Sequence, residues 1–242
     1  MRSQLLSVVC ISVALTWNSV PASADPPQVL TSAALVPGMS TEEIVARLTR
    51  NNQSRATALP AYESRRSYSL IYSGFASHRE AAEEAIMHYT PPGNKTFQVV
   101  SASGSKMIQS KVFAKLLESE SEATRIENQG QTALTVANYT FTLLAPRPSP
   151  YGGCYRLAVV PRRQDKFLYR GEICVNAVDF AVESIDAEPA KNPSFWIKKT
   201  RIEHRYQKIG QFWLPASNQT VTNMLFGGSA TLSIRYSDYK LH

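Results

Sequence analysis

Residues 154–215 restrict the fold more than any other part of the chain, because apolar and polar residues alternate along almost all of them. Alternation with a period of two is typical of β-strands that have one face in a core and the other in water. Breaks at residues 162–166, 177–179, 188–193 and 208–211 divide this stretch into consecutive strands. Almost no helical pattern separates them, so we expect the strands to pair antiparallel in one sheet.

Two cysteines in this stretch suggest the register of its first hairpin. If Cys154 lies directly opposite Cys174, Arg156 lies opposite Glu172 and the turn centres on Gln164. A cross-strand pair of opposite charge contributes roughly 0.2–1 kcal/mol, and a disulfide closing this loop adds up to about 3 kcal/mol. We therefore predict a Cys154–Cys174 disulfide. The same register places apolar pairs on the other face: Tyr155–Ile173, Leu157–Gly171 and Val159–Tyr169.

Residues 1–24 have the pattern of an export signal. Arg2 supplies a positive start, residues 5–15 an apolar stretch, and Ala22-Ser23-Ala24 a small-residue cleavage site. A membrane anchor is the alternative, but polar residues interrupt the run and it is too short to span a bilayer. We expect export to the periplasm, cleavage after Ala24, a Pro-rich segment over residues 25–38 and a single domain over residues 39–242.

Charge and cysteine content narrow the classes of partner. Arg2 is the one charged residue of the first 24, so its removal lowers the formal net charge from +7 to +6. For a basic exported protein we expect phospholipid head groups, lipopolysaccharide or acidic proteins as neighbours, and no nucleic acid. Two cysteines remain after Ala24, and in an oxidising compartment they favour a disulfide over a metal site. We predict no metal and no cofactor.

A helix start is marked clearly after the Pro-rich segment. Ser40 is the expected N-cap, and Glu43 completes a capping box. Met39 and Ile44 flank the cap as a hydrophobic staple. We expect this helix to end near residue 52.

Other elements follow from local periodicity. A second amphipathic helix is predicted over residues 106–122, because apolar residues recur there at helical spacing. Residues 79–89 are ambiguous: their Ala and Glu content favours a helix, whereas alternate residues share one strand face. Further strands are predicted over residues 68–72, 96–101, 139–143 and 230–236.

Two amphipathic helices are too few to cover both faces of so large a sheet. The fold expected is therefore mainly β (α+β), a curled antiparallel sheet whose concave side receives both helices as a lid. Such a sheet encloses an apolar cavity, a common way to hold a lipid or an acyl chain.

Several segments resemble one known superfamily. They are residues 166–171 (KFLYRG), 188–196 (EPAKNPSFW) and 205–215, with the turn at Pro92-Gly93 and the helix through residues 111–117. In these the chain resembles the periplasmic lipoprotein carriers that include LolA, LolB and the RseB/MucB regulators, most closely the outer-membrane lipoprotein-sorting group. The resemblance implies an incompletely closed antiparallel β-barrel with a helical lid, a cavity for lipoprotein acyl chains, and a strand over residues 79–89. Because the residue directly after the Ala24 cleavage site is not a cysteine, we expect a LolA-like form without a lipid anchor.

The apolar strand faces supply the candidate lipid-cavity residues. Ordinary core packing is the alternative for each aromatic side chain among them. The candidates are Tyr68, Leu70, Tyr72, Tyr139, Phe141, Leu143, Tyr155, Leu157, Val159, Tyr169, Ile173, Trp196, Leu232, Ile234 and Tyr236.

Catalytic motifs are absent from the sequence. His78, His88, His204 and His242 lack zinc-site spacing, and no nucleophile elbow, phosphate loop or dinucleotide fingerprint occurs. The favoured function is a non-enzymatic, monomeric periplasmic carrier that shields acyl chains of lipoproteins or related lipids and meets inner- and outer-membrane partner proteins. The alternatives are a periplasmic sensor that reports lipid or mislocalised lipoprotein, and a cell-envelope hydrolase.

Overall fold

The computed structural model describes residues 38–242, except 75–76, 146, 193–194, 196 and 226. The predicted signal peptide, most of the Pro-rich segment and the cavity candidate Trp196 lie outside the described residues.

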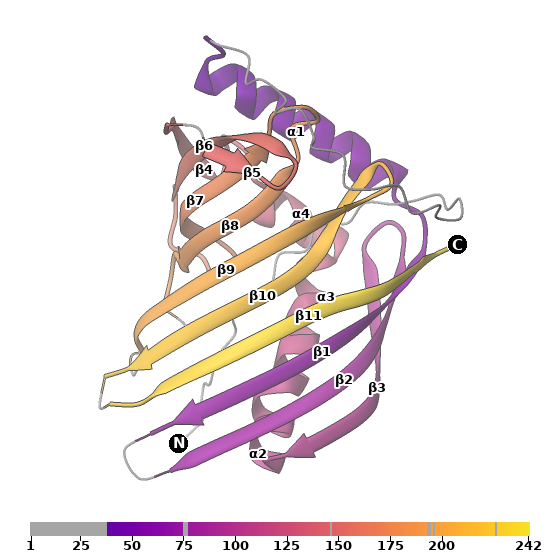
Figure 1. Ribbon diagram of the computed structural model, residues 1–242, viewed down its shortest axis with the longest axis vertical. Helices are drawn as coiled ribbons and strands as arrows, with labels where there is room; N and C mark the ends of the chain where they lie inside the picture. The colour runs from indigo at the N-terminus through magenta and orange to yellow at the C-terminus, as the bar shows by residue number, and fades with distance from the viewer. Residues whose placement is uncertain (1–37, 75–76, 146, 193–194, 196, 226) are drawn as a thin grey trace.

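The described strands form one antiparallel sheet. In chain order they are β1 (Tyr62–Ser73), β2 (His78–Thr90), β3 (Asn94–Gly104), β4 (Tyr139–Leu143), β5 (Arg147–Ser149), β6 (Gly152–Pro161), β7 (Tyr169–Asn176), β8 (Val182–Pro189), β9 (Ile197–Ile209), β10 (Phe212–Met224) and β11 (Ser229–Leu241). The spatial order is β3-β2-β1-β11-β10-β9-β8-β7-β6-β4, and β5 pairs with β6. Because β3 and β4 remain at opposite ends, the sheet curls without closing (Figure 1). The expected incompletely closed antiparallel sheet is confirmed.

The first helix, α1 (Thr41–Ala58), begins as predicted. The Ser40 side chain accepts a hydrogen bond from the Glu43 backbone N–H at 3.2 Å. The helix runs beyond the expected end near residue 52, because later side chains are held by tertiary contacts. Asn51 and Arg55 each donate to the carbonyl oxygen of Asp179 at 2.9 Å. These contacts compensate for the missing apolar stripe in the second half of the helix.

The second helical region is longer and less regular than predicted. It contains α2 (Lys106–Ile108), the π-helical segment η1 (Gln109–Phe113), α3 (Ala114–Thr124) and a further helix, α4 (Ile126–Thr132). Residues 79–89, ambiguous in propensity, lie in β2 as the family resemblance implies.

The hairpin of β6 and β7 contains the predicted disulfide in a different register. Cys154 and Cys174 are bonded, with their Cα atoms 5.5 Å apart. Cys154 pairs with Asn176, and Arg156 pairs with Cys174, so the expected register with the two cysteines directly opposed was wrong by two residues. A shift of two leaves every side chain on its predicted face. The cysteines therefore still meet, as diagonal neighbours.

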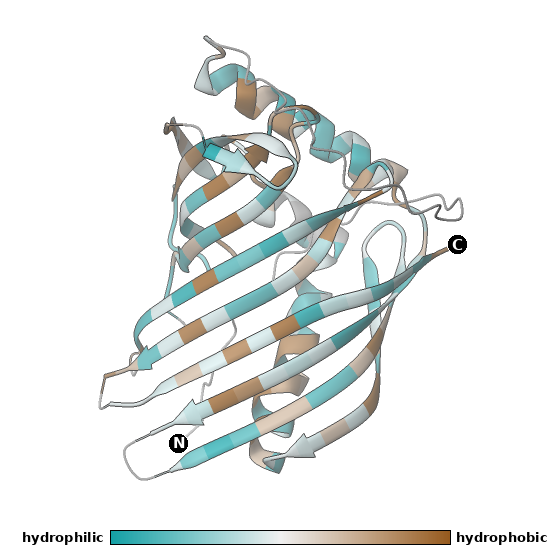
Figure 2. Cartoon of the chain, in the orientation of Figure 1, coloured by the Kyte–Doolittle hydropathy of each residue, from teal (hydrophilic) through white to brown (hydrophobic). Residues whose placement is uncertain are grey.

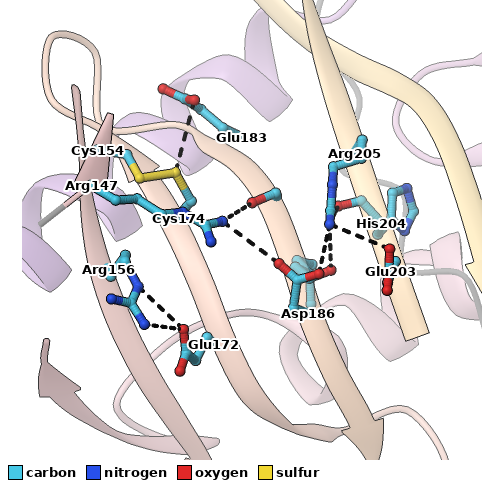
Figure 3. Close-up of polar contacts among 12 residues, drawn as sticks. Arg147, Cys154, Arg156, Glu172, Cys174, Glu183, Asp186, Glu203, His204 and Arg205 are labelled. Atoms are coloured by element: carbon cyan, nitrogen blue, oxygen red, sulfur yellow. Dashed lines mark hydrogen bonds and ion pairs between the residues drawn. A yellow bond between two sulfur atoms is a disulfide. The ribbon is translucent and has the colours of Figure 1, made fainter. Parts of the chain in front are cut away.

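Ion pairs cover the outer face of β5–β9 (Figure 3). Arg156 Nη2 lies 2.7 Å from Glu172 Oε2 as a diagonal pair, not the directly opposed pair expected. Arg205 and Arg147 lie on either side of Asp186, at 2.7 and 3.7 Å. All these side chains are partly exposed, and such pairs contribute about 0–1 kcal/mol each. This face is consequently a solvated surface.

The concave face follows from the pairing of strands. Adjacent strands place Leu157 opposite Ile173, Ile173 opposite Ile185, and Ile234 opposite Tyr68 on one continuous face. Hydrophobic and hydrophilic residues alternate along the long strands (Figure 2). The first half of α1 packs on the β6–β8 part of this face, and η1 with α3 packs on β1, β2 and β11. Both helices thus cover the concave side, as expected.

A buried ion cluster joins α3 to the sheet. Glu120 of α3 binds Arg66 of β1 at 2.5 Å and Lys95 of β3 at 2.9 Å, and all three side chains are at most 1% exposed. Burial alone would raise the pKa of Glu120, but the two cations outweigh it and hold this pKa at about 2. Arg66 also lies over the rings of Phe97 and Tyr236. The carboxylate therefore fixes the position of α3 over the concave face.

Replacing Glu120 by glutamine tests this anchor. The Glu120→Gln variant leaves two buried cations uncompensated, so we expect the free energy of unfolding to fall by roughly 3–5 kcal/mol. Urea denaturation followed by circular dichroism measures the loss. The matched control is Glu122→Gln, because Glu122 forms a partly exposed pair with Lys166 at 2.8 Å and should lose less than about 1 kcal/mol. Equal losses in the two variants would contradict the anchoring role.

Candidate ligand-binding cavity

A cavity of about 580 Å³ lies between α1, the β2–β3 turn, the end of α3 with the segment that follows it, and strands β7–β10. Figure 1 shows α1 lying across one end of the sheet, above this region. Small-molecule sites in proteins commonly have volumes of roughly 300–1,000 Å³. The cavity is therefore large enough for a ligand of that class.

The sheet side of the cavity is apolar and rich in aromatic rings. Its wall contains Tyr169 of β7, Val182 and Ile185 of β8, Tyr206 of β9 and Trp213 of β10. All five are buried, and they belong to the same packed cluster as the first half of α1. These side chains are held by the core, so the wall is preformed.

The helical side of the cavity is polar, and none of the described residues that line it from the helices is charged. Beyond Leu48, α1 contributes Thr49, Asn52, Gln53 and Thr57, which are half-buried or exposed. More threonines come from α3, α4 and the segment after it: Thr124, Thr132 and Thr135. The cavity thus has one apolar wall and one wall of hydroxyl and amide groups.

Asp179 holds α1 above the cavity. Its carboxylate accepts hydrogen bonds from Lys208 Nζ at 2.7 Å and Trp213 Nε1 at 2.9 Å. Its backbone carbonyl accepts bonds from Asn51 and Arg55 of α1. Burial alone would raise the pKa of Asp179, but the hydrogen bonds from Lys208 and Trp213 prevail and lower it. The β7–β8 turn therefore fixes both the helix and the cavity wall at Trp213.

The predicted cavity residues share the concave face but not one site. Of those described, Tyr169 lines the 580 Å³ cavity. Leu143 is 38% exposed, and Leu70 and Leu232 border a separate hollow of about 20 Å³. The remaining candidates pack beneath the helices: Tyr68, Tyr72, Tyr139, Phe141, Tyr155, Leu157, Val159, Ile173, Ile234 and Tyr236. That these residues contact lipid stays a prediction.

Sequence reasoning missed most of the cavity wall. Ile185 and Tyr206 follow the alternation that marks the concave face, so the strand pattern contained their signal. Asn52, Gln53 and Thr57 had no such signal, because polar residues on a helix are expected to face water. Their place at the cavity depends on the path of α1.

His204 lies on the concave face outside this cavity. Its ring stacks on Tyr206 with centroids 4.6 Å apart, and Nδ1 lies 3.4 Å from Asn218 Nδ2. Burial lowers the pKa of His204 to about 4, and the nearby Glu120 opposes that shift without reversing it. His204 is therefore a neutral core residue at physiological pH.

Two kinds of feature are absent from the described part of the chain. No group of three or more His, Cys, Asp or Glu side chains is arranged to hold a metal ion within the described ranges. Among the described helices, none combines the length and the apolar character needed to cross a membrane.

Comparison with known proteins gives remote structural neighbours. No protein-family model and no curated protein matches the chain. A DUF1329 family protein from Desulfovibrio piger is 13% identical, with a TM-score of 0.40 over 83% of this chain and 92% of that chain. LolA superfamily protein NE2245 from Nitrosomonas europaea is 10% identical, with a TM-score of 0.35 over 85% and 94%. A putative outer membrane lipoprotein-sorting protein domain from Vibrio parahaemolyticus is 10% identical, with a TM-score of 0.37 over 80% and 92%.

All three identities lie below 25% and all three TM-scores below 0.5, so these neighbours specify neither the function nor the site of this chain.

Because His204 is buried, we predict that the stability of the folded protein depends on pH. Its pKa falls from roughly 6.5 in the unfolded chain to about 4 in the folded protein. Between these values the unfolded state binds more protons, so stability declines as the pH falls from about 6.5 to about 4. Over this pH interval the free energy of unfolding should fall less in His204→Gln than in the wild type. The difference between the two decreases should reach roughly 3 kcal/mol.

Urea denaturation at a series of pH values measures this difference. His78→Gln is the control, because the His78 side chain is 63% exposed, and it should follow the wild-type curve. Parallel curves for wild type and His204→Gln would show that His204 does not titrate in this way.

Proposed function

We propose that this protein is a periplasmic carrier or chaperone that shields acyl chains of lipoproteins or related lipids during sorting to the outer membrane. The observation that carries the proposal is the 580 Å³ cavity, whose apolar wall lies on an unclosed sheet and whose opposite wall is a helix. An acyl chain gains roughly 0.8 kcal/mol for each methylene buried in such a space.

The Cys154–Cys174 disulfide supports the location. Structural disulfides persist in oxidising compartments such as the periplasm, and this one lies in a buried position of the β6–β7 hairpin. It agrees with the export signal predicted for residues 1–24.

The lining of the cavity favours binding over catalysis. Among the described residues, no His, Cys, Asp or Glu lines it, and these are the side chains that most often act as acids, bases or nucleophiles. Lys95 also lines the cavity, but its ammonium group is paired with Glu120 at 2.9 Å. The hydrolase alternative therefore has no candidate nucleophile–base pair at this site.

Filling the cavity tests the proposal. Ala56 lines it from an exposed position on α1, so Ala56→Trp occupies ligand space without entering the core. We expect wild type purified from the periplasm to carry acyl species in native mass spectra, and the variant to carry several-fold less. Ala46→Trp is the matched control, since Ala46 is exposed on the same helix outside the cavity.

A wild-type protein that is empty and binds no added acyl ligand would contradict the proposal. Depletion in cells separates a carrier from a sensor. Loss of a carrier leaves lipoproteins in the inner membrane, whereas a change in a stress response alone would overturn the carrier role.

A further inference from the structure

The cavity offers no charge to a ligand in its described walls. Lys95 is the one charged residue among those that line it. Its side chain has no exposed surface, and Nζ is 2.9 Å from Glu120 Oε1. The cation is therefore already neutralised and lies behind the wall.

No charged side chain of α1 lines the cavity. Arg55 binds the backbone carbonyls of Asp179 and Phe180 at 2.9 and 3.2 Å, and Arg47 pairs with Glu43 at 2.6 Å. The residues that α1 presents to the cavity are threonine, asparagine, glutamine and alanine. An ion placed against this wall would find hydrogen-bonding groups but no counter-charge.

Tyr169 gives a second observation, about the sheet side of the cavity. Its ring lines the cavity, but its hydroxyl is buried and offers no accessible surface to a ligand. The sheet side therefore presents apolar surface, and hydrogen-bonding groups are offered by the α1 side.

We propose that the enclosed part of the ligand is uncharged but bears hydrogen-bonding oxygens, as in an acyl chain with an ester, amide or hydroxyl group next to it. A ligand with an ion next to its ester is disfavoured, because that charge would lie against walls that offer it no counter-charge. Desolvating an ion without a partner is far more costly than desolvating an ester, whereas a plain hydrocarbon leaves the hydroxyl and amide groups of the α1 wall without partners. This inference rests on the proposed function and specifies its ligand class.

A matched pair of probes tests the charge preference. Monopalmitoylglycerol and palmitoyl lysophosphatidic acid share the chain, the ester and the glycerol, and they differ by the phosphate. We expect the wild-type protein to bind monopalmitoylglycerol at least tenfold more tightly, measured by quenching of tryptophan fluorescence below the critical micelle concentrations. Equal binding, or tighter binding of the phosphate, would overturn this inference alone. Failure of both probes to bind would overturn the proposed function with it.

One pair of variants assigns the preference to the α1 wall. Gln53→Lys adds a cation to that wall and should shift the preference at least tenfold toward the phosphate. Ser54→Lys, at the next exposed position outside the cavity, should not. Identical behaviour of these two variants would contradict the proposal.

Discussion

The position of the helices on the sheet depends on the ion pairs that the Glu120 carboxylate forms. This carboxylate joins α3 to β1 through Arg66 and to β3 through Lys95, with all three charges out of water. An unclosed sheet has a concave face that must be covered, and apolar packing alone permits a helix to slide along it. A buried ion cluster tolerates little displacement, because each charge loses its partner when the helix moves. The position of α3 therefore sets one boundary of the cavity.

On the side of the cavity away from α3, the helix α1 contributes both to the core and to the cavity wall. The first half of α1 buries Ile44, Val45 and Leu48 against the sheet. The second half has no apolar stripe and is held instead by hydrogen bonds to the β7–β8 turn around Asp179. Because polar side chains in this half need not be buried, they remain available to line the cavity.

The β6–β7 hairpin shows which structural features an alternating residue pattern can predict and which it cannot. Alternation assigned Leu157 and Ile173 to one face and Cys154 and Cys174 to the other, and the strand pairing confirms both faces. It did not give the register, because a shift of two residues leaves the alternation unchanged. The observed register centres the hairpin on Asp165, one residue beyond the predicted centre.

The candidate site was less accessible to prediction than the fold. The concave face was assigned correctly, but most of its large side chains lie beneath helices whose positions no local pattern specifies. Tyr169 lines the cavity whereas Tyr155, on the same face, packs against Phe180. The difference between them is the path of α1, which is a long-range property.

The sequence by itself determined most of the strands and their faces, the helix start at Ser40 and the pairing of the two cysteines, since each depends on neighbours in the chain or on a period of two. Tertiary structure alone decided where the sheet remains open, which residues line the cavity and why the described part of its lining carries no available charge. These features arise from contacts between residues far apart in sequence, such as Lys95 with Glu120 and Arg55 with Asp179. No local pattern records which distant side chain will neutralise a charge.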